Sequence, residues 1–227
     1  MNIIISFFVT VIGMGICVLG LDKTIVERIP LFRNSDPDEI FTSKEIGKFE
    51  RVILLCIGAV VCFASAMKIF DRVGNALGIA KMLICLLCMI GAAAFDYRER
   101  RIPNIFPATM AISAIVLLVA GVVLGQEGAV AYITTGVVAA VICGLILVAS
   151  AAVTKQGIGA GDIKLICAMA LIAGVYAVMG TLFFGVVLCS VYAIFVLLIK
   201  KKTASSAVPF APFLLFGYVL TLFMINF

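Results

Sequence analysis

The chain has 227 residues, of which 64% are hydrophobic and only 13% are charged, with a net charge of +5. Its mean hydropathy is +1.28, whereas a soluble domain is about half apolar and about a quarter charged. This composition excludes an ordinary soluble enzyme and predicts an all-α, polytopic helical bundle in a lipid bilayer, with no nucleic-acid partner. No linker is long enough to separate domains, so we expect residues 1–227 to form a single membrane-embedded domain.

A membrane-spanning helix needs about 20 apolar residues, and this length divides the chain into eight expected spans. The first, residues 2–21, is expected to be retained because no Lys or Arg precedes Lys23 and no small-residue cleavage site follows. Residues 163–199 are almost continuously apolar and too long for one crossing, so we expect a turn at Gly174 or Gly180. The eight expected ranges are 2–21, 52–70, 77–95, 105–124, 129–153, 163 to about 179, about 180 to 199, and 210–227.

Basic residues are distributed unequally between the two sets of alternating connections. Fourteen of the 17 Lys and Arg residues lie in the first, third, fifth and seventh connections and the adjoining span ends. Positively charged connections stay in the cytoplasm. We therefore expect a multi-pass protein of the cell (cytoplasmic) membrane, with both termini outside and with Asp96 and Asp162 on the cytoplasmic face, after the third span and before the sixth.

The loop 22–51 is the one sizeable polar segment. It contains an acidic cluster of Asp36, Asp38 and Glu39, which fits either a solvated connector or a patch that attracts a basic segment of a substrate. All eight cysteines lie in apolar segments and the chain has no His. We therefore expect no metal site and no cofactor, with the cysteines acting as small buried hydrophobic residues.

Asp162 ends a segment in which Gly157, Gly159 and Gly161 alternate with other residues. Glycines at these positions remove side chains where another helix or an extended peptide would approach closely. A carboxylate that caps the following helix is the structural alternative for Asp162. Lys164 either tunes the carboxylates or holds the substrate backbone, or it extends to the lipid headgroups.

Asp96 is followed by Pro103 and Asn104. Pro103 disfavours helix at the residue before it, and Asn104 is suited to cap the next span. The structural alternative for Asp96 is an ion pair with one of the arginines that follow it, which are Arg98, Arg100 and Arg101.

Two carboxyl groups held close together share a proton, because both cannot easily be ionised. One then acts as a general base on water while the protonated one polarises a scissile carbonyl, and the two titrate as a unit. The chain offers no His for a Ser or Cys triad and no plausible metal cage. A Ser–Lys dyad stays formally open, although Ser205 and Ser206 lie just past a lysine run that is typical of a topology signal. We therefore interpret Asp96 and Asp162 as the catalytic pair of a membrane aspartyl endopeptidase.

Three segments carry a resemblance to a known family. They are Asp96 followed by Ile102-Pro103-Asn104, then Gly159-Ala160-Gly161-Asp162 with Lys164, and then Pro209-Phe210-Ala211-Pro212-Phe213 leading to Gly217. In this order they resemble the type IV prepilin peptidases and archaeal preflagellin peptidases, which are GxGD membrane aspartyl peptidases, over about residues 79–217. The resemblance implies that Asp96 and Asp162 are catalytic. It also implies cleavage of the short basic leader of prepilin-like proteins, after a glycine and just before the pilin's hydrophobic helix, at the cytoplasmic membrane face.

We group a further set of residues as substrate-binding or supporting: Gly159, Gly161, Lys164, Pro103, Asn104, Asp36, Asp38 and Glu39. The chain departs from the family in its first loop. Many bacterial members have two CxxC pairs there and N-methylate the product using S-adenosylmethionine. The loop 22–51 contains no cysteine, so we expect no zinc and do not carry the methylation over.

Two alternatives remain from the sequence. An intramembrane protease of the presenilin and signal-peptide-peptidase type shares GxGD, but its Tyr-Asp pair and Pro-Ala-Leu motif are absent. A transporter or a membrane assembly factor would use the aspartates for ion coupling. Transporter sites lie near the membrane midplane on broken helices, whereas both aspartates here are expected at span ends on one face.

Overall fold

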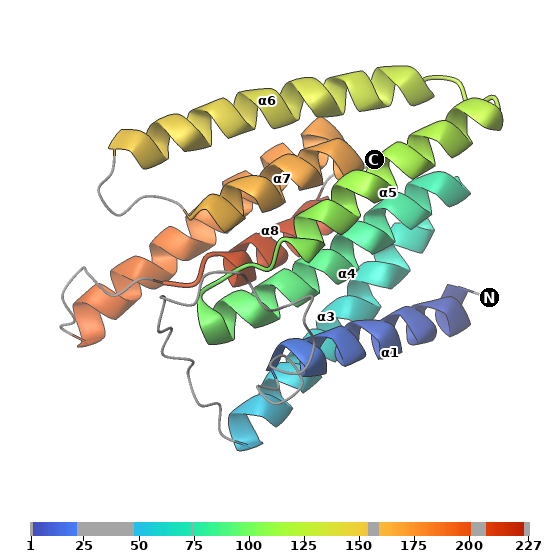
Figure 1. Ribbon diagram of the computed structural model, residues 1–227. Coiled ribbons are helices and arrows are strands. Elements are labelled where there is room, and N and C mark those ends of the chain that lie inside the picture. The colour runs from blue at the N-terminus through green and yellow to red at the C-terminus, as the bar shows by residue number, and fades with distance from the viewer. Residues whose placement is uncertain (1, 22–47, 74, 154–158, 201–207, 225–227) are drawn as a thin grey trace.

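The protein is described by a computed structural model that places residues 2–21, 48–73, 75–153, 159–200 and 208–224. Within these ranges the secondary structure is helical and contains no strand, which confirms the predicted all-α class. Figure 1 shows the helices as one bundle. They are α1 (Asn2–Leu21), α3 (Lys48–Arg72), α4 (Ala76–Glu99), α5 (Ile105–Val123), α6 (Ala129–Val153), α7 (Ala160–Lys200) and α8 (Ala211–Met224).

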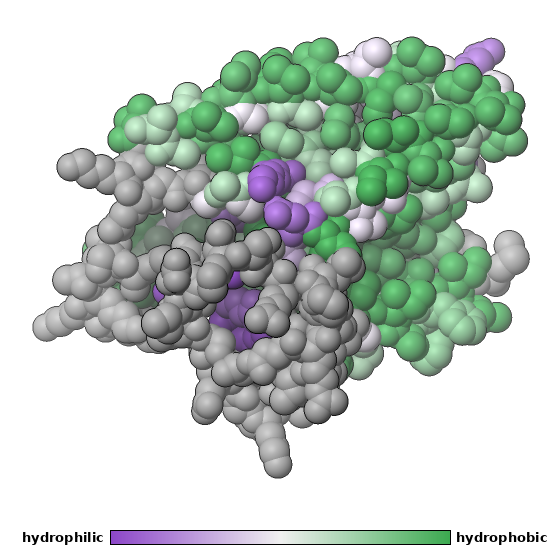
Figure 2. Space-filling view, viewed as in Figure 1, coloured by the Kyte–Doolittle hydropathy of each residue, from purple (hydrophilic) through white to green (hydrophobic). Residues whose placement is uncertain are grey.

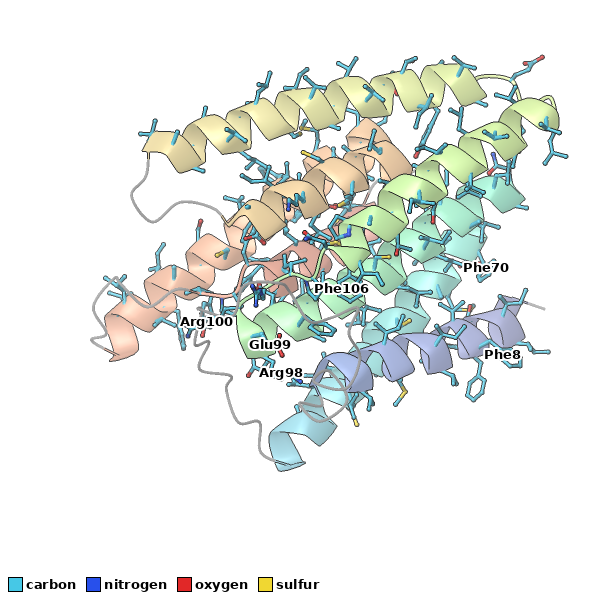
Figure 3. All side chains as sticks on the ribbon, viewed as in Figure 1. Phe8, Phe70, Arg98, Glu99, Arg100 and Phe106 are labelled. Atoms are coloured by element: carbon cyan, nitrogen blue, oxygen red, sulfur yellow. The ribbon has the colours of Figure 1, made fainter. Side chains whose placement is uncertain are left out.

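The helices have the length and apolarity of membrane spans. In the described parts of the chain, α3, α4, α5, α6 and α7 each contain a stretch long enough to cross a bilayer, and α1 and α8 contain shorter apolar stretches. Their outer faces are apolar: Phe8 on α1 is 62% exposed and points away from the bundle in Figure 3, and hydrophobic residues cover most of the face in Figure 2. A polytopic membrane bundle is thus confirmed, while the number of eight spans and the outside location of both termini stay predictions.

Helix α4 lies at the centre and packs against α1, α3, α5, α7 and α8. It begins where the side chain of Asn75 accepts a hydrogen bond from the amide of Gly78, with 2.6 Å between Oδ1 and N. Farther along, Gly91 leaves no room for a Cβ, because that atom would overlap the ring of Phe106 on α5. The ring of Phe95, one turn later, lies 5.6 Å from that of Phe106 between centroids. Small and aromatic residues therefore seat α5 against the half of α4 that ends at Asp96.

Helix α7 is interrupted at Gly174, where φ is 83° and ψ is 175°. This left-handed conformation is readily available only to glycine. Before Gly174, α7 follows α6 in the opposite direction: the thiol of Cys167 donates to the carbonyl oxygen of Ala140 with 3.4 Å between sulfur and oxygen, and the next contact pairs Gly136 with Leu171.

After the interruption, α7 runs along α8. Gly217 on α8 contacts Gly185 on α7, and the ring of Tyr192 lies 5.3 Å from that of Phe213. The chain therefore reverses direction at Gly174, as Figure 1 shows. The predicted turn at Gly174 or Gly180 occurs at the first position, and the predicted boundary near residues 179 and 180 is wrong. Gly180 lies inside the helix, because Gly174 alone in α7 leaves the helical conformation.

Two other predicted boundaries shift by a few residues. Helix α4 continues to Glu99, so Asp96 lies in its last turn rather than after it. Helix α7 begins at Ala160, so Asp162 lies in its first turn rather than before it. The boundaries predicted from hydropathy lie where the apolar residues stop. The helices themselves continue for about another turn, because their backbone hydrogen bonds extend into the polar residues.

The contacts of α4 fix the direction of its neighbours. Helix α1 runs parallel to α4, and α8 runs antiparallel, with Ala211 beside Asp96 and Tyr218 beside Met82. We call the end where α4 stops and α5, α7 and α8 begin the aspartate end, and the opposite end the far end. Helix α1 starts and α8 stops at the far end, in agreement with the marked termini in Figure 1.

Candidate active site

Asp96 is presented by the end of α4. The helix closes at Arg100, which has a φ of 53° and donates its amide to the carbonyl oxygen of Asp96. The side chain of Asp96 is only 6% exposed. Its Oδ2 accepts a hydrogen bond from the amide of Ala211, with 2.8 Å between N and O. Because Ala211 is the first residue of α8, the carboxyl group lies at a helix N-terminus, where amides lack intrahelical partners.

Two further groups act on Asp96. The backbone amide of Phe210 faces the same carboxyl group, and Arg100 adds a positive charge nearby. Arg98 forms an ion pair with Glu99, as Figure 3 shows at the end of α4. The hydrogen bond to Asp96 thus comes from the backbone of α8, and the alternative of an ion pair with an arginine is reduced to the longer-range influence of Arg100.

Asp162 is the third residue of α7. Its carboxyl group faces the amide of Gly159, as an acidic residue does at the third position of a capping box. The capping alternative therefore describes part of its environment. It does not account for Oδ1, which is buried and has no hydrogen-bond partner among the described residues. A buried polar atom without a partner is costly, so a second reason for this carboxyl group is required.

The two carboxyl groups are brought together by the start of α7. The charge of Asp96 is close enough to act on Asp162. Gly161 packs against Ile102 in the connection after α4, where an added Cβ would lie 3.2 Å from the Cβ of Ile102. This close approach is what the alternating glycines predicted for position 161. Gly159 lies next to the carboxyl group of Asp162, and Gly157 is outside the described residues.

Lys164 and Asn104 link the same two segments. The Nζ of Lys164 donates to Oδ1 of Asn104 at 3.2 Å. Asn104 does occupy the position before α5, but its side chain makes no capping hydrogen bond there. The predicted capping role is therefore wrong, because the amide side chain is turned toward Lys164 instead. Pro103, which precedes it, is buried.

Three predicted supporting residues remain predictions, and two backbone amides join the site. Asp36, Asp38 and Glu39 lie outside the described residues. The amides of Phe210 and Ala211 were not predictable as partners of Asp96 from physical reasoning on the sequence. The available signal was the spacing of Pro209 and Pro212, which marks the start of a helix.

The surroundings of the carboxyl groups are polar on one side and apolar on the other. Figure 2 shows hydrophilic residues gathered beside the grey segments, within an otherwise hydrophobic face. On the other side, an apolar pocket of about 100 Å³ between α1, α3, α4 and α8 is lined by Ala93, Tyr97 and Pro212, among others. Among the described residues, no group of three or more His, Cys, Asp or Glu side chains could hold a metal ion. Chemically, the site offers two adjacent carboxyl groups in unequal environments.

The chain was compared with models of protein families. The model of the type IV leader peptidase family matches residues 82–194. The matched segment runs from α4 into α7, includes both aspartates and ends before Pro209. No curated protein and no solved structure matches the chain significantly.

Proposed function

Because the chain belongs to the type IV leader peptidase family and is a multi-pass membrane protein, we propose that Asp96 and Asp162 form its catalytic pair. The substrates are prepilin-like proteins, whose basic leader is cleaved at the cytoplasmic face of the cell membrane. The convergence of three distant segments on these carboxyl groups carries the proposal: α7 contributes Asp162, the connection before α5 packs on Gly161, and α8 donates its first amide to Asp96.

The chemistry follows from the shared proton. The ionised carboxylate removes a proton from water as the water oxygen attacks the scissile carbonyl carbon. The protonated carboxyl group donates to the carbonyl oxygen, so that a neutral tetrahedral intermediate forms. The first group then passes its proton to the leaving nitrogen, while the second group takes back a proton from a hydroxyl of the intermediate. The C–N bond breaks as the new carboxyl group forms, and the pair returns to its single-proton state. Water is the only co-reactant, and each proton stays on the pair or the products.

The position of the pair suits a substrate cut directly before an apolar helix. The carboxyl groups lie at the aspartate end of the bundle, where spans stop and polar connections begin. A leader approaching from water and a helix lying in the bilayer would meet at this depth. The apolar pocket beside Tyr97 and Pro212 provides a surface for the first residues of such a helix.

The test is cleavage of a co-expressed prepilin-like protein by wild type, Asp96→Asn and Asp162→Asn. Both variants should lose cleavage, because each removes one partner of the proton exchange while keeping the shape of the side chain. Asp71→Asn is the matched control, since Asp71 is an exposed carboxylate at the other end of the bundle. Mass spectrometry of the product identifies the cut and shows whether a methyl group is added.

Normal turnover in either active-site variant would refute the catalytic pair. A substrate in which the glycine before the apolar helix is replaced by a bulky residue should remain intact with wild type. Cleavage of that substrate at the same bond would refute the proposed leader specificity without affecting the aspartyl mechanism.

A further inference from the structure

The two carboxyl groups of the proposed pair differ in what contacts them. Asp96 is nearly fully buried, accepts the amide of Ala211 at 2.8 Å, and faces the amide of Phe210 and the charge of Arg100. Asp162 faces one amide, that of Gly159, and its Oδ1 is buried without a hydrogen-bond partner among the described residues. Burial disfavours a negative charge on both carboxyl groups, but the two amides and Arg100 offset this at Asp96, whereas Asp162 has one amide.

We propose that the N-terminus of α8 holds Asp96 as the carboxylate that deprotonates water, and that the proton shared by the pair resides on Asp162. This division of roles rests on the proposed peptidase function. Hydrogen bonds to the charged form of a carboxyl group favour that form, and an adjacent negative charge disfavours ionisation of its neighbour. The group with more donors therefore ionises first, and the other keeps the proton.

The environment of Asp162 fits the protonated role. An ionised Asp162 would leave Oδ1 buried, charged and without a donor, beside a second negative charge. A protonated Oδ1 is instead a hydrogen-bond donor. It can then donate to the scissile carbonyl oxygen in the complex.

The structure of α8 explains why its first amide is available to Asp96. The amides of the first turn of a helix have no intrahelical partner, and Pro209 and Pro212 on either side of Ala211 fix where that turn starts. Gly217, two turns later, sits so close to α7 that an added Cβ would lie 2.7 Å from the amide nitrogen of Gly185. This tight packing holds the start of α8 at a fixed position relative to Asp96.

The charged groups on the elements packed against Asp96 can be named for the described residues. Among the helices packed on α4, the described residues of α1, α5 and α8 include no charged side chain. Among the described residues, Arg100 acts on this carboxyl group, and the charge of Asp96 in turn acts on Asp162. Lys164 on α7 donates to Asn104. The remaining charged residues on α3, α4, the connection to α5, and α7 are Lys48, Glu50, Arg51, Lys68, Asp71, Arg72, Lys81, Arg98, Glu99, Arg101 and Lys200.

The experiment removes the donating hydrogen and leaves Asp96 in place. Ala211→Pro deletes the amide hydrogen at the first helical position, where proline is tolerated, and Phe210 before it is not helical. Because Ala211 is fully buried, a second variant carries an ester in place of this amide, which removes the same hydrogen without adding a ring. Ala211→Gly is the matched control and keeps the donor. The readout is the pH dependence of leader cleavage by purified enzyme.

We expect the acid limb of the pH–rate profile to move upward by about one pH unit or more in the ester and proline variants, since a hydrogen bond to a charged group is lost. The profile of Ala211→Gly should keep its acid limb. A variant with only structural damage would lose activity at every pH without moving either limb.

A shift of the alkaline limb instead would overturn the assignment and exchange the two roles. An unmoved profile for the active ester variant would also overturn it, even if the proline variant is inactive. These outcomes are separate from the peptidase proposal, which depends on the loss of cleavage in Asp96→Asn and Asp162→Asn.

Discussion

The two ends of the bundle are built differently. At the aspartate end, α4 stops and α5, α7 and α8 start. The site there consists of helix termini and includes one carboxyl oxygen that has no partner in the described part of the chain. At the far end, tyrosine side chains contact neighbouring helices. The Nζ of Lys81 lies 4.1 Å from the ring centroid of Tyr132, whose hydroxyl donates to the carbonyl of Ile172 at 3.4 Å.

A second tyrosine completes the far end. Tyr218 on α8 is fully buried and donates its hydroxyl to the carbonyl oxygen of Met82 on α4 at 3.1 Å. The polar groups named here therefore have partners from neighbouring helices. The tyrosines at the far end therefore link neighbouring helices, whereas the helix termini at the aspartate end present the carboxyl groups proposed for chemistry.

The largest expected effect separates activity from stability at the aspartate end. Asp162→Asn should lower the turnover number by about 10²- to 10⁴-fold, the usual contribution of a general acid or base. The thermal unfolding midpoint in detergent should not fall, because asparagine keeps the shape of the side chain and one oxygen that can accept from the amide of Gly159, while Oδ1 has no partner to lose among the described residues. A turnover loss accompanied by an equal loss of folded protein would contradict this separation.

The next effect concerns the far end and is expected in stability. Gly174→Ala should lower the free energy of unfolding by about 1–3 kcal/mol, because a side chain is forced into the left-handed region. The added Cβ would also lie 2.9 Å from the hydroxyl oxygen of Tyr132. Denaturant titration in micelles measures the change. Gly15→Ala on α1 is the control, since nothing lies within 4 Å of its Cβ, and an equal loss there would refute the explanation.

A smaller effect tests the link between Lys164 and Asn104. Lys164→Met and Asn104→Leu should each reduce the turnover number by about threefold to tenfold, the worth of one hydrogen bond that positions the start of α7. The double variant should be no worse than the worse single variant, because both remove the same contact. Independent, multiplying effects measured by steady-state cleavage would show that the two side chains act separately.

The smallest effect is expected for Tyr132→Phe. The hydroxyl contact with the carbonyl of Ile172 is long, at 3.4 Å, and the ring remains for Lys81. The free energy of unfolding should change by no more than about 0.5 kcal/mol, with turnover as in wild type. A loss of turnover comparable with that of Lys164→Met would mean that the far end also serves catalysis, and the comparison of the two ends would fail.

Much of the fold was predictable because each membrane span requires a long run of apolar residues. Apolar stretches located the helices, and the asymmetry of Lys and Arg placed Asp96 and Asp162 at the same end. The reversal in α7 was harder, since Gly174 and Gly180 look alike in the sequence. What distinguishes them is the ring of Tyr132 against Gly174, which belongs to another helix and leaves no local signal.

The site was predictable at the level of side chains and less so at the level of the backbone. Gly161 predicts a close approach of another segment, and Ile102 does pack against it. Asp162 predicts a carboxyl group at the same place, near the charge of Asp96. Almost every residue type has a backbone amide, so the identity of residue 211 does not indicate that its amide donates to Asp96. The capping role predicted for Asn104 was wrong because the side-chain oxygen of asparagine can accept a hydrogen bond either from a helix amide or from Lys164. The sequence does not distinguish these two partners.

The reversal at Gly174 has a consequence for the surrounding lipid. The part of α7 before it has 14 residues and is about 21 Å long at about 1.5 Å per residue, whereas a bilayer's hydrocarbon core is about 30 Å thick. Helix α6 beside it has 25 residues. Either the bilayer thins next to this short segment, or the reversal lies below the headgroups. The acyl chain length of the lipids therefore affects how α7, the helix that carries Asp162, is accommodated in the bilayer.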